Sequence, residues 1–186
     1  HKKILWQNFL FLAKGSWSVK NLKHCVKACK KAKKYLHIAG GKTFLPSSYI
    51  KSYGMVGGSE KLQIIDKCDA LLFPVRWHEP FGIAIIEAMA MGLPVIGSPY
   101  GSLPELINNN TGKIVENKNE LHFFLKETKN HFKPKNIRKY VEEKFSSNIM
   151  TKHYLKYYDL IISKNNLNHK NPSWKDPKGP LLLLDF

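Results

Sequence analysis

Short apolar runs alternate with amphipathic segments along most of this chain. The runs have the length of buried strands and are bounded by residues that favour turns. We therefore predict strands at residues 9–13, 35–39, 50–53, 70–73, 94–97 and 112–115.

The amphipathic segments between and after these runs predict helices. The first helix begins near Val19, which Ser18 can cap, and carries lysines that we expect to face solvent: Lys23, Lys27, Lys30 and Lys34. In the second helix, residues 59–68, we expect the side chains of Leu62, Ile64 and Ile65 to point inward. Further helices are predicted at residues 83–91, 103–108, 118–132, 134–145 and 148–163. Strands that alternate with helices indicate an α/β fold with a doubly wound, Rossmann-like parallel sheet.

The end of the chain differs in composition from the rest. A length of 186 residues suits one domain with a real core, which we place at residues 1–163. Residues 164–186 form a predicted extended tail, polar and proline-containing up to Lys178, with an apolar patch at residues 181–184. We expect this tail either to dock on a surface outside this chain or to fold onto its own domain.

The chain is strongly basic, with 30 Lys and Arg against 14 Asp and Glu and a net charge of +16. This excess favours phosphorylated ligands, anionic membrane surfaces or nucleic acid, although a lysine-rich genome is an equal explanation. Arginine, the main residue of base readout, occurs only at Arg76 and Arg138, so no specific nucleic-acid partner is expected.

The cysteines indicate a reducing compartment. Cys25, Cys29 and Cys68 are odd in number and form no C-x-x-C pair, so we expect them to be small core residues. The first residues are too short and polar a segment for a signal peptide, and no apolar run reaches the ~18 residues of a membrane span. We expect a cytoplasmic protein that contacts a membrane peripherally, if at all.

Two carboxylates mark the candidate site. Glu79 lies in the loop after the strand at residues 70–73, and Glu87 follows after seven intervening residues, about one turn inside the next helix. Helix N-termini attract phosphate through their unpaired N–H groups and the macrodipole, while carboxylates accept hydrogen bonds from hydroxyls. The spacing therefore suits a ligand with both hydroxyls and phosphate, such as a sugar nucleotide. No pattern in the sequence demands a metal or another cofactor.

The segment from Glu79 to Glu87, with Pro80, Phe81 and Gly82 after the first glutamate, is similar to the E-x7-E motif of family 4 glycosyltransferases (glycosyl transferases group 1). The resemblance extends through residues 70–76, 92–107 and 112–115, and more loosely over about residues 9–162. These enzymes have the GT-B fold, in which two Rossmann-like domains face each other across a cleft.

The resemblance covers only the C-terminal, donor-binding half of that fold. It implies a retaining transferase of the hexosyltransferase class, acting in polysaccharide or glycolipid synthesis with a UDP- or GDP-sugar donor and without a bound metal. The acceptor-binding N-terminal domain is missing from this chain, so the chain alone is expected to be inactive.

The resemblance also implies roles for individual residues. Glu79 contacts the donor sugar, Glu87 binds the ribose diol, and the backbone N–H groups of Phe81, Gly82 and Ile83 approach the sugar or diphosphate. Gly82 permits the close approach because it has no side chain.

Further residues come from two other loops. Lys20 matches the family lysine that stabilises the departing diphosphate, and Met55 and Val56 match the loop beside the base. The family arginine falls on Gly15, or on Lys14 after a shift of one residue, so the arginine position is not matched.

Two alternative functions remain open. One is a GT-B relative such as a nucleotide-sugar epimerase, which shares the sheet, although the Pro-Phe-Gly sequence favours the transferase. The other is a non-catalytic module whose basic surface binds an anionic membrane or nucleic acid.

Overall fold

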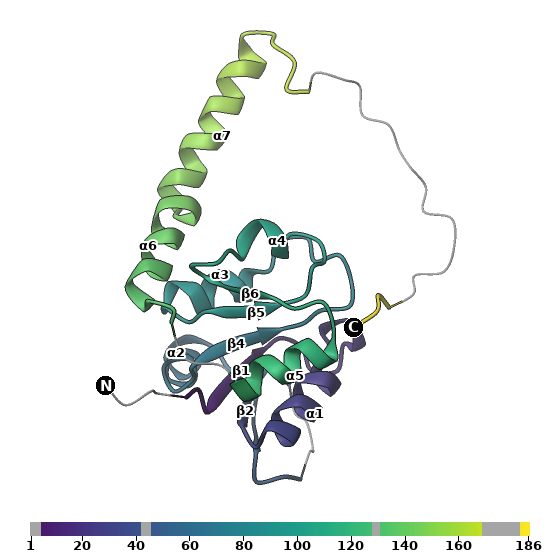
Figure 1. Cartoon of the computed structure of the whole chain (residues 1–186). Coiled ribbons are helices and arrows are strands. Elements are labelled where there is room, and N and C mark those ends of the chain that lie inside the picture. Colours follow the sequence, from purple (N-terminus) through teal and green to yellow (C-terminus); the bar gives the residue numbers. More distant parts are fainter. Residues whose placement is uncertain (1–4, 42–45, 128–130, 169–182) are drawn as a thin grey trace.

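The computed structural model describes residues 5–41, 46–127, 131–168 and 183–186. Within these residues, six parallel strands form one sheet in the order β3-β2-β1-β4-β5-β6 (Figure 1). Their bounds are β1 (Asn8–Leu12), β2 (Tyr35–Ala39), β3 (Ile50–Gly54), β4 (Ala70–Phe73), β5 (Val95–Gly97) and β6 (Gly112–Ile114). The order reverses between β1 and β4, which pair directly, so a topological switch point lies at the centre of the sheet.

Helices cover both faces of this sheet. They are the short 3-10 helix η1 (Ser18–Lys20), α1 (Leu22–Ala32), α2 (Gly58–Asp66), α3 (Ile83–Ala90), α4 (Leu103–Leu106), α5 (Lys118–Glu127), α6 (Pro134–Phe145) and α7 (Ser147–Ile162). Helix α1 packs against α5 on one face, and α3 packs against α6 and against β4 and β5 on the other (Figure 1). The predicted doubly wound parallel sheet is therefore confirmed.

The central strands form the core because a parallel sheet covered on both faces needs apolar side chains on both sides. Every residue of β4 and β5 is buried, as are four of the five in β1. The three cysteines are buried and unpaired, as predicted. Burial raises the pKa of the Cys29 and Cys68 thiols to about 12, so both thiols are neutral at physiological pH.

The first helix starts later than predicted. Instead of a helix from Val19 capped by Ser18, the chain forms η1 and then turns at Asn21, whose φ of 64° is left-handed, before α1 begins. Asparagine tolerates this conformation better than most residues. The Asn21 amide also donates to the Pro74 carbonyl at 2.7 Å, which ties this turn to the end of β4.

Two predictions about side-chain burial were wrong. Leu62 is 45% exposed, because the buried residues of α2 are Ile64 and Ile65 and Leu62 lies at the edge of the face that they form. Lys34 is buried, because the chain reverses after α1 and its ammonium donates to the Trp6 carbonyl at 2.6 Å.

The C-terminal elements differ in how they contact the domain. No residue of α7 is buried, and this helix projects away from the sheet (Figure 1). The described end of the chain, residues 183–186, returns to the domain: the Leu184 N–H donates to the Arg76 carbonyl at 3.1 Å. Half of the predicted apolar patch, Leu181 and Leu182, lies outside the described residues. Among those described, no helix is long and apolar enough to cross a bilayer.

Candidate functional site

The switch point between β1 and β4 brings two loops together at the carboxyl edge of the sheet, where open α/β sheets bind ligands. The loop after β1 carries Lys14 and Lys20, and the loop after β4 leads through Glu79 to α3. The two loops are joined directly, since the Arg76 N–H donates to the Val19 carbonyl at 2.8 Å. Lys20 and Glu79, which are 59 positions apart in sequence, thus lie on one surface.

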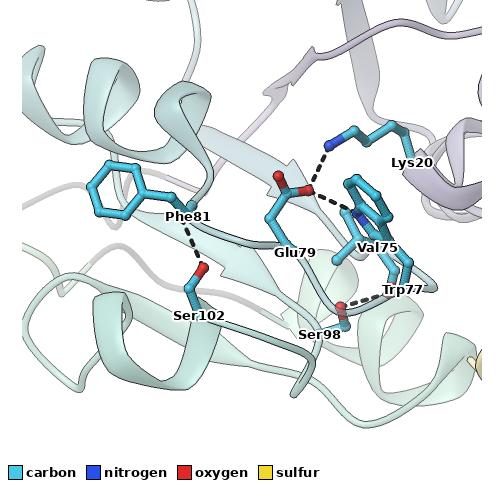
Figure 2. Close-up of polar contacts among 7 residues, drawn as sticks. All are labelled: Lys20, Val75, Trp77, Glu79, Phe81, Ser98 and Ser102. Atoms are coloured by element: carbon cyan, nitrogen blue, oxygen red, sulfur yellow. Dashed lines mark hydrogen bonds and ion pairs between the residues drawn. The ribbon is translucent and has the colours of Figure 1, made fainter. Parts of the chain in front are cut away.

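Glu79 is the centre of this surface. Its carboxylate is mostly buried and accepts two hydrogen bonds on Oε2, from Lys20 Nζ at 2.5 Å and from Trp77 Nε1 at 2.8 Å (Figure 2). Lys20 Nζ also lies 4.8 Å from the centroid of the Trp77 ring. The charge of Glu79 is therefore paired and its orientation is held from two sides, while Oε1 is the oxygen that a ligand hydroxyl can reach.

The loop after β5 holds the Glu79 segment in place. Ser102 donates its N–H to the Glu79 carbonyl at 2.9 Å and its hydroxyl to the Phe81 carbonyl at 2.8 Å (Figure 2). Gly101 has a φ of +64°, and a Cβ there would lie 2.3 Å from the Glu79 carbonyl oxygen. Glycine is required at this position because the two backbones touch.

The N-terminus of α3 lies at the end of the Glu79 loop. Gly82 precedes the helix with a φ of 87°, and no side chain in the described structure caps it. The Ile85 N–H donates to the Gly82 carbonyl at 2.9 Å, while those of Ile83 and Ala84 come before the first intrahelical bonds and lie at the positive end of the helix dipole. Ile83 is exposed, and the Phe81 ring packs edge-on against Phe145. Of the three residues predicted to offer backbone N–H groups, Phe81 and Ile83 are exposed and Gly82 is buried, and anion binding by these groups stays a prediction.

Glu87 lies one turn into α3 and has a partner of its own. Lys61 Nζ on α2 is 2.5 Å from Glu87 Oε1. Neither Lys61 nor the Trp77 indole N–H was predicted to hold a carboxylate. The sequence could have suggested the Trp77 contact, because Trp77 stands only two residues from Glu79. Lys61 is 26 positions from Glu87, and no local sequence pattern connects the two.

The remaining predicted site residues lie on loops around the pair of Lys20 and Glu79. Lys14 Nζ lies over the Trp17 ring, 5.1 Å from its centroid, within the loop after β1. Met55 is 79% exposed in the loop between β3 and α2, and Val56 packs partly against the core. The structure thus brings Lys20 into contact with Glu79 and leaves Lys14, Met55 and Val56 on neighbouring loops.

A cavity of about 650 Å³ opens beside Glu79. It is bounded by the loops after β4 and β5 and by α6, and its wall combines carboxylate, hydroxyl, ammonium and aromatic groups: His78, Glu79, Phe81, Ser102, Tyr140 and Lys144. Such a wall can bind a hydroxyl-rich ring, since it offers both hydrogen-bond partners and flat apolar faces. The described residues contain no cluster of three or more His, Cys, Asp or Glu that could hold a metal ion.

Comparison with known proteins identifies relatives of this chain. An uncharacterized 41.2 kDa protein in the cps region of Klebsiella pneumoniae is 34% identical over 112 residues, which are 57% of this chain and 31% of the relative. AviGT4, a glycosyltransferase involved in avilamycin A biosynthesis, matches with a TM-score of 0.70 at 19% identity, over 87% of this chain and 53% of that structure. Anabaena HepE, solved with UDP and glucose, matches with a TM-score of 0.68 at 17% identity, over 82% of this chain and 48% of that one.

These matches show the fold and the extent of the likeness. The architecture is one Rossmann-like half of the GT-B fold, as the sequence resemblance implied. The chain spans about a third of the length of the Klebsiella relative and about half of each of these two solved structures. The family model for glycosyl transferases group 1 matches residues 7–127, more than half of the chain, and the chain therefore belongs to that family.

Proposed function

We propose that this chain is the donor-binding half of a retaining glycosyltransferase, which transfers a hexose from a UDP- or GDP-sugar to an acceptor. The observation that carries the proposal is the ion pair of Lys20 and Glu79 directly before the uncapped N-terminus of α3. A hydroxyl-binding carboxylate, a cation and a helix N-terminus converge there, and a sugar diphosphate carries the groups that all three recognise.

Each residue has a distinct role in this proposal. Oε1 of Glu79 accepts hydrogen bonds from donor-sugar hydroxyls, and Glu87 accepts them from the ribose diol. Lys20 and the N–H groups at the start of α3 stabilise the negative charge of the departing diphosphate, a large electrostatic demand in such a transfer. The neighbouring loop with Met55 and Val56 flanks the base. No metal is needed, because these protein groups supply the positive potential.

The family match supports the transferase over the epimerase-like alternative. The complexes of Anabaena HepE with UDP-glucose and with UDP and glucose support a uridine nucleotide as the first ligand to test. The net charge of +16 is compatible with a cytoplasmic protein that contacts an anionic membrane carrying a lipid-linked acceptor.

The exposed side chains of helix α7 support the proposal that this chain works with a second, acceptor-binding half of the enzyme. Seven of its apolar and aromatic side chains are more than half exposed: Met150, Tyr154, Leu155, Tyr157, Tyr158, Ile161 and Ile162. A face of this kind usually marks an interaction surface. We propose that it meets the acceptor-binding half, without which the chain binds donor but does not transfer sugar.

Isothermal titration of the chain with UDP, GDP and their glucose and mannose conjugates tests this function. We expect saturable binding of one nucleotide series, weakened about tenfold or more by Glu79→Gln for the sugar conjugates, since a charged hydrogen bond is lost. Glu143→Gln on the exposed face of α6 is the matched control and should leave binding unchanged. A folded sample that binds none of these ligands at millimolar concentration would overturn the proposal.

A further inference from the structure

Lys61 joins α2 to α3 at the same edge of the sheet as the candidate site. Its ammonium contacts Glu87 Oε1 at 2.5 Å, as short as the N–O distance between Lys20 and Glu79. Helix α2 begins at Gly58, directly after the loop that carries Met55 and Val56. The ion pair therefore connects the helix behind this loop with the carboxylate on α3.

This pair differs from ordinary surface ion pairs. Lys113 and Glu120 are 4.0 Å apart, and Lys139 and Glu143 are 3.6 Å apart with side chains 70% and 59% exposed. Lys61 is only 24% exposed and Glu87 only 38%. Exposed pairs restrict their partners weakly, because two long side chains must lose rotamer freedom. Glu87 is about as exposed as Glu120, whose side chain is 35% exposed, so the difference lies in the short N–O distance and in the less exposed lysine. The short contact with Lys61 restricts the direction of the Glu87 carboxylate.

The loop directly before α2 is open to solvent. A Cβ placed on Gly57 or Gly58 would meet no atom within 4 Å, and the Met55 side chain nearby is 79% exposed. Lysine has three N–H donors and one is used on Oε1. Oε2 of Glu87 remains as the oxygen that can accept from a neighbouring diol.

We propose that Lys61 is a positioning residue for the nucleoside end of the donor site. It holds Glu87 by Oε1 so that Oε2 meets the 2′- and 3′-hydroxyls of a ribonucleotide, and it thereby makes the site selective for ribose over deoxyribose. This inference rests on the proposed donor-binding function and extends it to a residue on a separate helix.

The test compares three ligands: UDP, 2′-deoxy-UDP and inorganic pyrophosphate, or the guanosine pair if GDP binds more tightly. We expect Lys61→Met to raise the Kd of the ribonucleotide about fivefold to tenfold, the usual cost of one lost charged hydrogen bond. The Kd values of the deoxynucleotide and of pyrophosphate should change less than about twofold. The preference for ribose should therefore shrink, which a general loss of structure would not produce.

Single and double variants of Lys61 and Glu87 measure how far the two side chains depend on each other in binding the ribonucleotide. The Lys61→Met, Glu87→Gln double variant should lose no more ribonucleotide affinity than the weaker-binding single variant, since both remove the same interaction. Lys61→Arg should keep most of the affinity, because it keeps the charge and the donors. Lys113→Met, on the distant pair with Glu120, is the matched control and should behave like the wild type.

The outcomes separate the two proposals. A wild-type chain that binds neither nucleotide overturns the donor-site function and this inference with it. A wild type that binds, with Lys61→Met equal to it for all three ligands or equally weak for all three, overturns the role of Lys61 alone. If Lys61→Met does not fold, an unchanged ribose preference in a folded Lys61→Ala or Lys61→Gln variant overturns it as well.

Discussion

Two side chains meet at one carboxylate oxygen of the candidate site. Lys20 and Trp77 both donate to Glu79 Oε2, and the side chains of Lys20 and Glu79 are only 12% and 9% exposed. A carboxylate this poorly solvated depends on its donors, since an uncompensated buried charge costs several kcal/mol. The site is therefore coupled to the stability of the fold.

Lys20→Met tests this coupling. We expect it to lower the free energy of unfolding by about 3 kcal/mol, because it leaves Glu79 buried without its cation. Adding Glu79→Gln should restore part of that loss, because a neutral amide needs no counter-charge. Urea denaturation of the single and double variants measures both values. A double variant less stable than Lys20→Met alone would contradict the pairing.

The residues of this site were predictable to different degrees. Glu79 and Glu87 were predicted from their places after a strand and inside a helix, and Lys20 from the family resemblance; the structure brings Lys20 to Glu79, and ligand binding by all three stays a prediction. The indole N–H of Trp77 and the ammonium of Lys61 were not assigned to the carboxylates, because a hydrogen bond between side chains depends on rotamers and on packing. Whether Lys14, Met55 and Val56 touch a ligand stays a prediction.

At the scale of elements, α1 shows how packing controls the reactivity of side chains. Cys25 and Cys29 lie on its buried face, against the sheet and α5. Burial raises the pKa of both thiols, that of Cys29 to about 12. A raised thiol pKa means that the nucleophilic thiolate is scarce at pH 8 in the folded protein and more abundant in the unfolded one, whose thiol pKa is ordinary.

Thiol alkylation measures this difference. At pH 8, iodoacetamide should label the folded chain at Cys25, Cys29 and Cys68 at least about a hundredfold more slowly than the chain in guanidinium, where the thiols are exposed. Mass spectrometry of peptides resolves the three sites. Labelling of Cys25 or Cys29 at the denatured rate would mean that α1 is not packed as described.

The elements themselves were largely predictable, since strands and helices follow local periodicity. The predicted helix at residues 134–145 has the bounds of α6, and the predicted strand at residues 70–73 is β4. The start of α1 was wrong by three residues because the left-handed turn at Asn21 depends on its hydrogen bond to Pro74, 53 positions away. The periodicity of apolar residues along the chain cannot predict a contact between such distant positions.

At the scale of the whole molecule, the described end of the chain closes over the loop after β1. Arg76 Nε donates to the Leu184 carbonyl at 2.6 Å, Tyr100 donates to the Asp185 carbonyl at 2.6 Å, and the Phe186 ring lies 6.0 Å from that of His24. These contacts hold α1 and the loops after β4 and β5 together from outside. The segment thus braces the edge that carries the candidate site.

Truncation after residue 168 tests this brace. We expect the free energy of unfolding to fall by about 1–2 kcal/mol, from the loss of two or three hydrogen bonds and one aromatic contact. Hydrogen exchange should become faster at the loop after β1 and at Arg76, and stay unchanged in α6. Identical exchange in both proteins would show that residues 183–186 do not dock there.

The sequence by itself determined the strands and helices and the class of fold, because these follow from local spacing. It also determined where the two glutamates stand, because their motif is confined to one loop and one helix. Only the tertiary structure decided which lysine forms an ion pair with which glutamate. Lys20 meets Glu79 across 59 positions and Lys61 meets Glu87 across 26, and both contacts exist only because parallel strands gather their following loops at one edge of the sheet.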